Sequence, residues 1–252
     1  MSKMISEIED AALLVKKAFQ SKSITSYVLT GAGLSKGSNI PTFRGEDGLW
    51  EKYKFEEVAT KKAWQKNPEK LWFFYADGID LILKAQPNPA HYAITDLETN
   101  GYCDYIVTQN ADGLHQKAGS KNVLEIHGNI THVRCTKCNK IKEFIELPKI
   151  VPPICDCGGM FRPDVVLFDE ILPHKLIEKA YNVAKKAKLV IIVGTSAEVM
   201  PAAYLPILSK QNKAQILVFN TEKTEHTTVA DIFIQGKCEE TLPLFVKKLL
   251  EV

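Results

Sequence analysis

Apolar runs that end in polar, glycine-bearing segments constrain the fold of this 252-residue chain more than any other feature. Three such runs accompany the segments GAGLSKGSNIPTFRG (31–45), TQNADGLH (108–115) and LEIHG (124–128). In an open α/β sheet, ligands bind outside the carboxyl ends of the strands. Polar segments delivered to that edge by three strands therefore predict a single binding or active site.

Apolar residues at three- and four-residue spacing between these runs predict helices. The expected helices cover residues 1–20, 68–84, 91–100, 173–188 and 239–250. The expected strands cover residues 27–30, 105–108, 123–126, 165–168, 189–193 and 216–219. Alternating strands and helices predict an α/β fold with a doubly wound parallel sheet. The run LVIIV at 189–193 is typical of a central strand that is buried on both faces.

The composition excludes several classes of protein. With 45% apolar and 25% charged residues, the chain is typical of a soluble globular protein of one domain, or one domain plus a small satellite. A net charge of +2 gives no general attraction for nucleic acid. No apolar stretch reaches the roughly 20 residues that span a bilayer, and the amphipathic N-terminal stretch does not resemble a signal peptide. We therefore expect a cytoplasmic monomer without membrane or nucleic-acid partners.

Four cysteines between about Thr131 and Arg162 indicate a metal site. Cys135, Cys138, Cys155 and Cys157 have the spacing C-x2-C-x16-C-x-C, which can place four thiolates tetrahedrally around zinc. The second pair is one residue shorter than the usual C-x2-C. Two disulfides are the alternative, which a reducing cytoplasm disfavours. Because no open coordination position is evident, we expect structural zinc, and we interpret Cys103 and Cys238 as buried apolar thiols.

The first glycine segment has the features of a dinucleotide-binding loop. Its spacing, GxGxxxG, departs from the usual GxGxxG, and a simple tight turn is the alternative. Backbone N–H groups near Gly31–Gly33 are candidates to hold a pyrophosphate. Two later predicted strands end in Gly194-Thr195-Ser196 and Asn220-Thr221-Glu222. These segments offer small hydrogen-bonding groups and a ribose partner at the same sheet edge.

The chain contains, in this order, GAGLS, IPTFRG, TQNADGLH, LEIHG, the four cysteines, RPDVVLF, GTS with PAA, and NTE. This order resembles the sirtuin family of NAD-dependent protein deacylases, with archaeal and bacterial members most similar. The resemblance runs from about residue 27 to the last helix. It implies a Rossmann-type large domain with a small zinc-binding domain inserted, and a cleft between them for NAD and acyl-lysine. The large domain is expected at residues 1–44, 101–130 and 163–252. A helical insertion with the cofactor loop is expected at 45–100, and the zinc module at 131–162.

The same resemblance assigns catalytic roles to three residues. His127 would be the general base, since the pKa of imidazole suits proton abstraction near neutrality. Asn110 and Asp112 would orient the ribose and carboxamide of the nicotinamide end. The alternatives are a histidine that merely closes a strand and an Asn-x-Asp sequence that serves only as a turn. His115 is expected to be a helix or packing residue.

The implied NAD contacts come from several segments, and NAD would be consumed with release of nicotinamide and O-acyl-ADP-ribose. The residues implied to contact NAD are Gly31, Ala32, Gly33, Lys36, Phe43, Arg44, Gln109, Asn110, Ala111, Asp112, His127, Gly194, Thr195, Ser196, Asn220, Thr221, Glu222 and Cys238. The Val166 carbonyl and the Phe168 ring would contact acyl-lysine, on a strand able to pair with an extended peptide. Tyr75 would line the acyl pocket, or serve only as a core residue.

Several residues depart from the family pattern. Asp169 stands where the family usually has glycine, and Ala111 where it usually has isoleucine. Gly78 occupies the position of the arginine that relatives acting on succinyl-lysine use, so we expect neutral acyl groups, acetyl first, to be preferred. A mono-ADP-ribosyltransferase and a non-catalytic NAD sensor are the alternative functions.

Overall fold

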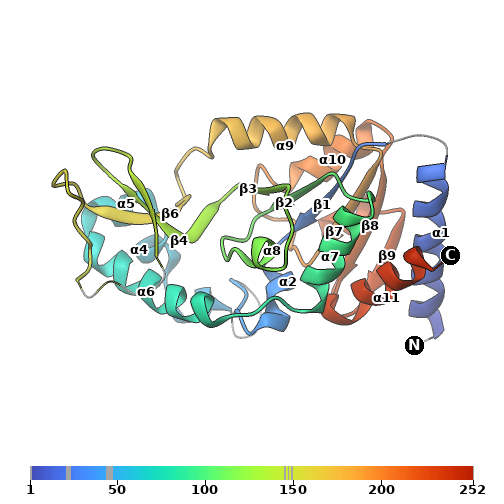
Figure 1. Ribbon diagram of the computed structural model, residues 1–252, viewed down its shortest axis with the longest axis horizontal. Helices are drawn as coiled ribbons and strands as arrows, with labels where there is room; N and C mark the ends of the chain where they lie inside the picture. The colour runs from blue at the N-terminus through green and yellow to red at the C-terminus, as the bar shows by residue number, and fades with distance from the viewer. Residues whose placement is uncertain are drawn as a thin grey trace.

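A six-stranded parallel sheet organises the larger part of the molecule (Figure 1). The computed structural model describes residues 2–20, 24–43, 48–144, 146, 148 and 150–251. In spatial order the strands are β3 (Val123–Glu125), β2 (Tyr105–Thr108), β1 (Ser26–Thr30), β7 (Leu189–Val193), β8 (Gln215–Asn220) and β9 (Ile232–Gln235). The strand order changes direction between β1 and β7. In doubly wound folds this switch point opens a crevice where ligands bind.

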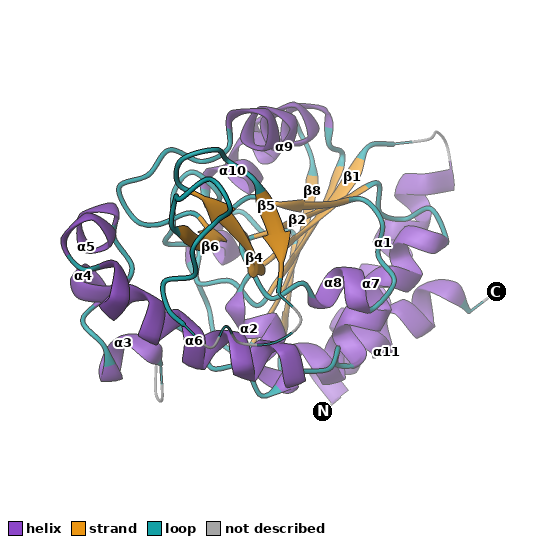
Figure 2. Ribbon diagram, turned by 60° about the vertical axis from the view of Figure 1, so that its left-hand side comes forward, coloured by secondary structure: helices purple, strands orange, loops and turns teal. Residues whose placement is uncertain are grey.

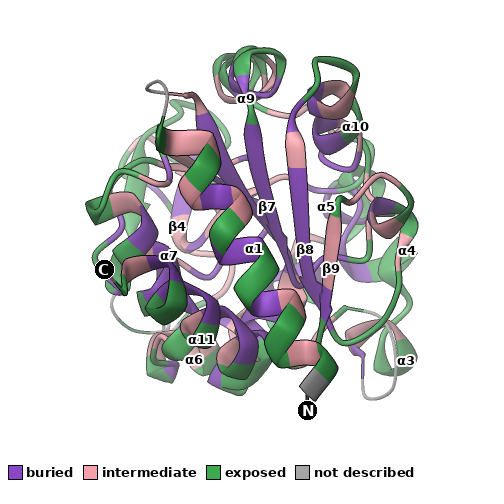
Figure 3. Ribbon diagram, turned by 90° about the vertical axis from the view of Figure 1, so that its right-hand side faces the viewer, coloured by how far each residue is buried: buried purple, intermediate pink, exposed green. Residues whose placement is uncertain are grey.

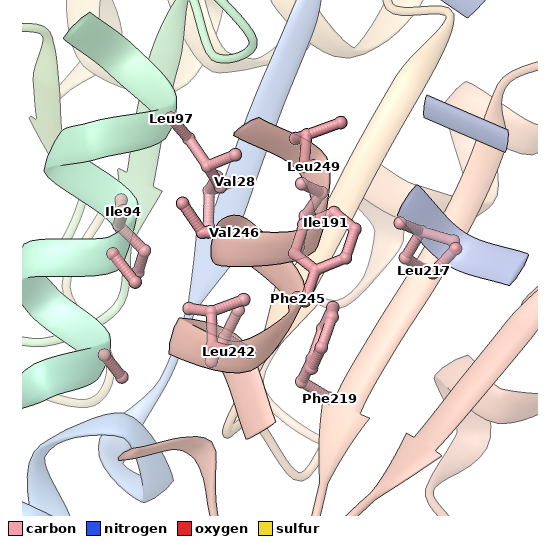
Figure 4. Close-up of a cluster of buried hydrophobic side chains, with 14 of the residues drawn as sticks. Val28, Ile94, Leu97, Ile191, Leu217, Phe219, Leu242, Phe245, Val246 and Leu249 are labelled. Atoms are coloured by element: carbon pink, nitrogen blue, oxygen red, sulfur yellow. The ribbon is translucent and has the colours of Figure 1, made fainter. Parts of the chain in front are cut away.

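Helices cover both faces of this sheet because its strands are apolar on both sides (Figure 3). On one face lie α1 (Ser2–Gln20), α7 (Pro89–Thr99) and α11 (Cys238–Leu250). On the other lie α9 (His174–Lys186) and α10 (Tyr204–Gln211). Successive side chains of a strand point to opposite faces. Accordingly, Val28 packs with Ile94 and Phe245 in the first core, shown in Figure 4, while Tyr27 and Leu29 belong to the second.

A smaller antiparallel sheet forms the other end of the molecule (Figure 2). Its order is β5 (Ile141–Glu143), β4 (Gly128–Cys135) and β6 (Phe161–Val165). The helices of this end are α3 (Leu49–Lys52), α4 (Phe55–Val58), α5 (Lys61–Lys66) and α6 (Pro68–Lys84). Helices α5 and α6 share a separate core with β4 and β6, and the buried indole of Trp72 donates a hydrogen bond to the Phe161 carbonyl at 2.8 Å.

Short helices lie in the connections that follow β1, β2 and β8. They are α2 (Ala32–Ser35), α8 (Leu114–Lys117) and the 3-10 helices η1 (Lys36–Ser38) and η2 (Glu225–Thr228). None of the helices in the described ranges is both long enough and apolar enough to cross a lipid bilayer.

The expected doubly wound parallel sheet is confirmed, with one strand misplaced. Residues 165–168 were expected to form a strand, but β6 ends at Val165, where its pairing with Gly128 ends. Beyond it, the Val166 amide donates to the His127 carbonyl and the Phe168 amide to the Ala59 carbonyl. The prediction of a strand is therefore wrong for residues 166–168, because the amides of Val166 and Phe168 bond to residues outside both sheets.

The expected division of the chain also differs from the packing at one element. Residues 45–100 were assigned to the insertion, yet α7 contributes Ala90, Ile94 and Leu97 to the core that contains Val28 of the large sheet. Helix α6, in contrast, packs in the core of the smaller end. Helical periodicity identifies a buried face but not the core that buries it, so we now propose a boundary between α6 and α7.

Candidate functional site: a cleft between the two sheets

A cavity of about 1110 Å³ lies beside the switch point and reaches the smaller end of the molecule. It brings together the three segments that the sequence singled out, represented by Gly31, Asn110 and His127, with Gly194 and Asn220 from the two later strands. The apolar runs place these segments side by side because the parallel strands that precede them all end at one edge of the sheet.

The glycines of the first segment allow the backbones after β1 and β7 to approach closely. A Cβ atom at Gly33 would lie 2.8 Å from the Gly194 carbonyl oxygen, and one at Gly194, where φ is +60°, would lie 2.3 Å from the Leu34 nitrogen. The Gly31 and Gly33 amides donate to the Val193 and Gly194 carbonyls. Both were expected to be available for a pyrophosphate. They instead join the two chain segments, which leaves the Ala32 amide as the donor of this loop without a partner among the described residues.

Hydrogen bonds hold Asn110 and Asp112 rigidly in the floor of the cleft. The Asn110 side-chain amide donates to the Gly31 carbonyl and to Ser35 Oγ, both at 3.1 Å. Ser35 Oγ donates in turn to Asp112 Oδ2 at 2.6 Å. Burial raises the pKa of Asp112, and its bonds from Ser35 and the Leu114 amide partly offset that rise. Ser35 was quoted in the GAGLS segment without a role. Its place in this network comes only from the structure.

His127 lines the cleft and presents a basic ring nitrogen to it. Its Nδ1 lies 3.0 Å from the Gln109 carbonyl oxygen, which can only accept, so Nδ1 carries the proton and Nε2 keeps its lone pair. Burial lowers the pKa of His127, and the bond to Gln109 partly offsets this shift. The histidine is therefore neutral at pH 7, with a defined tautomer, as a general base requires.

The other predicted NAD contacts that the structure describes also line the cleft. Thr195 Oγ1 accepts from the Gln109 side chain at 2.9 Å, and the Asn220 side chain donates to the Thr195 carbonyl at 3.1 Å. The cavity lining also includes Lys36, Phe43, Ala111, Ser196, Thr221, Glu222 and Cys238. Burial raises the pKa of the Cys238 thiol to about 12, and this thiol lies in the core of the large domain. The prediction for Arg44 falls outside the described residues.

Aromatic rings dominate the opposite end of the cleft. Trp50 stacks on Phe43 with ring centroids 5.4 Å apart and contacts Phe168 edge-on at 6.4 Å. Phe74 stacks on Trp50 and meets Tyr75 at 5.2 Å. The sequence analysis named Phe43, Tyr75 and Phe168 but missed Trp50 and Phe74. Clustered aromatic residues between 49 and 75 were the available signal, but nothing in their spacing indicates which of them face a cavity.

A charged pair holds the segment that follows β6. Arg162 makes two hydrogen bonds to the Glu170 carboxylate, at 2.6 and 2.8 Å, and donates to the Val165 carbonyl at 2.7 Å. Glu170 also accepts from the Leu167 amide. Together with the bond from the Val166 amide to His127, these contacts leave the Val166 carbonyl without a donor from the described part of the chain. One main-chain acceptor therefore remains for a ligand in the cleft.

The four cysteines predicted to bind metal lie together at the tip of the smaller sheet. Their sulfur atoms are all within 4.8 Å of one another, and the Cys135–Cys157 and Cys138–Cys155 pairs are 3.5 and 3.8 Å apart. Zinc–sulfur bonds of about 2.3 Å in a tetrahedron require sulfur separations of about 3.8 Å. These separations are also far longer than a disulfide bond of about 2.05 Å. Gly159 leaves room for this arrangement, because a Cβ there would lie 2.7 Å from Cys135 Sγ.

Comparisons with known proteins agree with this geometry. The Sir2 family model matches residues 31–201. The NAD-dependent protein deacylase of Pyrococcus abyssi is 45% identical over 90% of this chain and 94% of its own length. That of Aquifex aeolicus is 46% identical over 88% of this chain and 93% of its own.

Solved structures show the same likeness. A Sir2 homologue in complex with NAD superposes with a TM-score of 0.87 at 44% identity, covering 94% of this chain and 93% of that one. A Sir2 variant with a deacetylated p53 peptide and 3'-O-acetyl ADP ribose gives a TM-score of 0.86 at 32% identity, covering 93% and 96%. The resemblance noted in the sequence is confirmed: this chain belongs to the Sir2 family.

Proposed function

We propose that this protein is an NAD-dependent protein-lysine deacylase that acts first on acetyl-lysine. The observation that carries the proposal is the position of the unprotonated His127 Nε2 in the cleft. The Asn110–Asp112 network lies on one side of it, and on the other lies the Val166 carbonyl, which receives no hydrogen bond from a described residue. Family membership supports it, because the relatives are deacylases and their structures hold NAD, peptide and acetylated ADP-ribose.

The residues present fit NAD as the co-substrate. The close approach of Gly33 and Gly194 keeps side chains out of the switch point, so a dinucleotide can lie against the backbone there. Bound NAD supplies an electrophilic ribose carbon, to which the acyl oxygen adds as nicotinamide leaves. Asn220 and Glu222 hold the ribose farther from the reacting end, while Lys36 provides positive charge near the phosphates.

His127 and the Asn110–Asp112 network do the protein's chemical work in this proposal. His127 Nε2 takes a proton from a ribose hydroxyl, while the Gln109 carbonyl fixes the ring and stabilises the imidazolium that forms. The Asn110 side-chain oxygen receives no hydrogen bond from a described residue, so it is available to accept one from the ligand. Because its amide group is already held by Gly31 and Ser35, Asn110 does not need to reorganise during the reaction.

The substrate lysine enters between Val166 and the aromatic rings. The Val166 carbonyl accepts the N–H of the acyl-lysine amide, and Phe168 packs along the aliphatic stem. Recognition through the main chain and apolar contact reads little of the surrounding sequence. We therefore infer that many acylated proteins are substrates.

Four further proposals accompany this function. Cys135, Cys138, Cys155 and Cys157 hold structural zinc, since all four ligand positions are filled by the protein. The protein acts in the cytoplasm, where these thiols stay reduced. It acts as a monomer. Nucleic acid is not a partner, in keeping with a net charge of +2.

Mass spectrometry of one lysine peptide, carrying acetyl, longer neutral or succinyl groups, tests the proposed reaction. We expect loss of the neutral acyl group only when NAD is present, with equal amounts of nicotinamide and O-acyl-ADP-ribose. Nicotinamide release with ADP-ribose attached to protein would identify a transferase instead. NAD binding without turnover on any peptide would identify a sensor, and either result would overturn the proposal.

A further inference from the structure

Two buried histidines that the proposed reaction does not use lie beneath the catalytic segment. His91, on α7, and His115, on α8, are 0% and 1% exposed. Their rings meet edge to face, with centroids 5.2 Å apart. His91 Nε2 and His115 Nδ1 have no hydrogen-bond partner among the described residues. Unpaired polar atoms of this kind are rare in protein interiors.

The partners of each ring determine its tautomer. The Asn88 amide donates to His91 Nδ1 at 3.3 Å, so the His91 proton is on Nε2. Thr30 Oγ1 donates to Thr108 Oγ1 at 2.8 Å, so it must accept from His115 Nε2, which lies 3.0 Å away. His115 therefore carries its proton on Nε2 and has a lone pair on Nδ1. The two unpaired atoms are thus a donor and an acceptor, on two rings in contact.

Hydrogen bonds connect His115 to the proposed catalytic segment. From His115 Nε2 the chain passes through Thr30 Oγ1 to Thr108 Oγ1, which also accepts from the Asn110 amide at 3.0 Å. The Thr108 oxygen thus holds the Asn110 backbone in place, and the direction of its bond from Thr30 is set by His115. The side chain of Asn110 is held independently, by Gly31 and Ser35.

The other ring is connected to the segment that follows β1. The Asn88 side chain donates to the Leu34 carbonyl at 2.8 Å and to Ser38 Oγ at 3.1 Å, while the Asn88 backbone amide donates to His91. The His91–His115 pair therefore lies between two hydrogen-bonded networks, one reaching the loop after β1 and the other reaching Asn110.

We infer that His115, with His91 as its buried partner, is a positioning residue. It orients the Thr30–Thr108 hydroxyl chain and thereby the Asn110 backbone at the reacting end of the cleft. This inference rests on the proposed function for the role of Asn110, but the hydrogen-bond chain itself does not.

Burial keeps both rings neutral, which the positioning role requires. It lowers the pKa of His91 to about 4, and burial together with the nearby His91 lowers the pKa of His115 to about 3. A protonated His115 would still donate from Nε2, but the second N–H, on Nδ1, would be buried without an acceptor among the described residues. The neutral tautomers are the pair that the surrounding bonds allow.

Steady-state kinetics of four single variants and one double variant test the inference. His115→Phe keeps the ring volume but removes the donor, and His115→Gln restores an N–H near the position of Nε2. Thr30→Val removes the next hydroxyl of the chain. His226→Phe is the matched control, since His226 is equally buried and bonded to the Ala203 carbonyl at 2.9 Å. Small displacements of positioned groups can cost up to about 100-fold in rate.

We expect His115→Phe and Thr30→Val each to lower kcat for nicotinamide release at least tenfold, with KM for the peptide changed less than about twofold. His115→Gln should recover most of kcat, and the His115→Phe/Thr30→Val double variant should lose little more than either single variant. Near-wild-type kcat in a folded His115→Phe or Thr30→Val variant would overturn the inference. So would a loss of kcat in His226→Phe as large as that in His115→Phe.

Nitrogen-15 NMR of the histidine rings separates this inference from the proposed function. The expected spectrum has His91 and His115 as neutral Nε2–H tautomers that do not titrate between pH 5 and 8. If the wild-type protein had no turnover, the proposed function would fail while these tautomers could still be observed. An Nδ1–H tautomer at His115 would overturn the inference whatever the activity.

Discussion

The two ends of the cleft are built by different physical means. At the sheet end, polar side chains are buried and held by hydrogen bonds: Asn110, Asp112 and Asn220 are each less than 10% exposed, and each makes at least one such bond. At the opposite end, the side chains are aromatic and partly open, with Phe43 44% exposed and Phe168 38% exposed.

This difference suits the two ligands in the proposed reaction. A dinucleotide is a single chemical species, and fixed dipoles recognise it without reorganising. Acylated peptides vary in sequence, and apolar rings accept many of them because contact between rings and aliphatic chains has little directionality. The rigid end is built on six paired strands, whereas the open end depends on a three-stranded sheet and four cysteines.

Removal of zinc should break the open end and leave the rigid end folded. We expect Cys135→Ala to abolish turnover, because structural zinc contributes directly to the folding of small modules. Hydrogen exchange should show lost protection in β4 and β6 but retained protection in β1 and β7. Cys103→Ala, in the core of the large domain, is the control and should keep its zinc. Unchanged turnover in a zinc-free Cys135→Ala protein would refute the role of the module.

His127→Ala tests the proposed general base, which lies where the two ends of the cleft meet. Loss of a general base typically costs about 10²- to 10⁴-fold in rate, and we expect a reduction in kcat of that size with little change in Tm. The base must be unprotonated, and burial lowers its pKa. The acid limb of kcat/KM should therefore lie below pH 6.5, the ordinary value for histidine. A limb at or above that value would contradict the assignment.

Acid should destabilise the rigid end through its buried histidines. The folded-state pKa values of His91 and His115, about 4 and about 3, lie below the unfolded value of 6.5. Below pH 6.5 the unfolded chain binds more protons, so the free energy of unfolding should fall with decreasing pH, by a few kcal/mol by about pH 4. His115→Gln should make this dependence shallower. His174→Gln, at an exposed position, should leave it unchanged, and equal slopes in both variants would contradict the prediction.

The preference for neutral acyl groups can be altered at Gly78 on α6. A Cβ there would meet only Ile130 Cδ1, at 3.5 Å, so a side chain can enter the cleft without displacing backbone. We expect Gly78→Arg to raise the ratio of desuccinylation to deacetylation about tenfold, since a charge-assisted hydrogen bond contributes about 1.5–3 kcal/mol. Gly78→Met, which adds similar length without charge, should not. A wild-type enzyme that removes succinyl faster than acetyl would already refute the preference.

The smallest expected effect is at Asp169, which lines the cleft next to Phe168. Its backbone has φ +66°, a conformation that asparagine also tolerates, so Asp169→Asn removes the charge without new strain. We expect wild-type protein to favour lysine over glutamate beside the acylated residue by a few-fold, as for exposed charges. The variant and high salt should both reduce that ratio. A ratio that is the same in both proteins would exclude Asp169 from peptide selection.

Local sequence was sufficient to predict the helices and strands whose pattern lies within one continuous segment. The boundaries of 68–84, 105–108 and 189–193 were predicted as observed, because continuous apolar runs and helical periodicity are properties of a single segment. The four cysteines predicted to bind metal lie together in the structure for the same reason, since their spacing already contains the two turns that bring each pair together.

Features that depend on partners distant in sequence were decided by the tertiary structure. The sequence predicts that the amides of Gly31 and Gly33 are available for a phosphate, but in the fold they donate to carbonyl groups at the end of β7. Helix α7 has an amphipathic pattern that fits either core, and only the tertiary structure places it against the six-stranded sheet. The tautomers of His127 and His115 follow from a carbonyl 18 residues away and a hydroxyl 85 residues away.

Sequence by itself therefore determined the fold class, the cysteine cluster and the segments that form the cleft, because each is encoded in short-range pattern. Tertiary structure alone decided which donors and acceptors in that cleft remain free. A hydrogen bond uses one donor and one acceptor, and whether a group such as the Val166 carbonyl is already engaged depends on every chain segment that folds beside it.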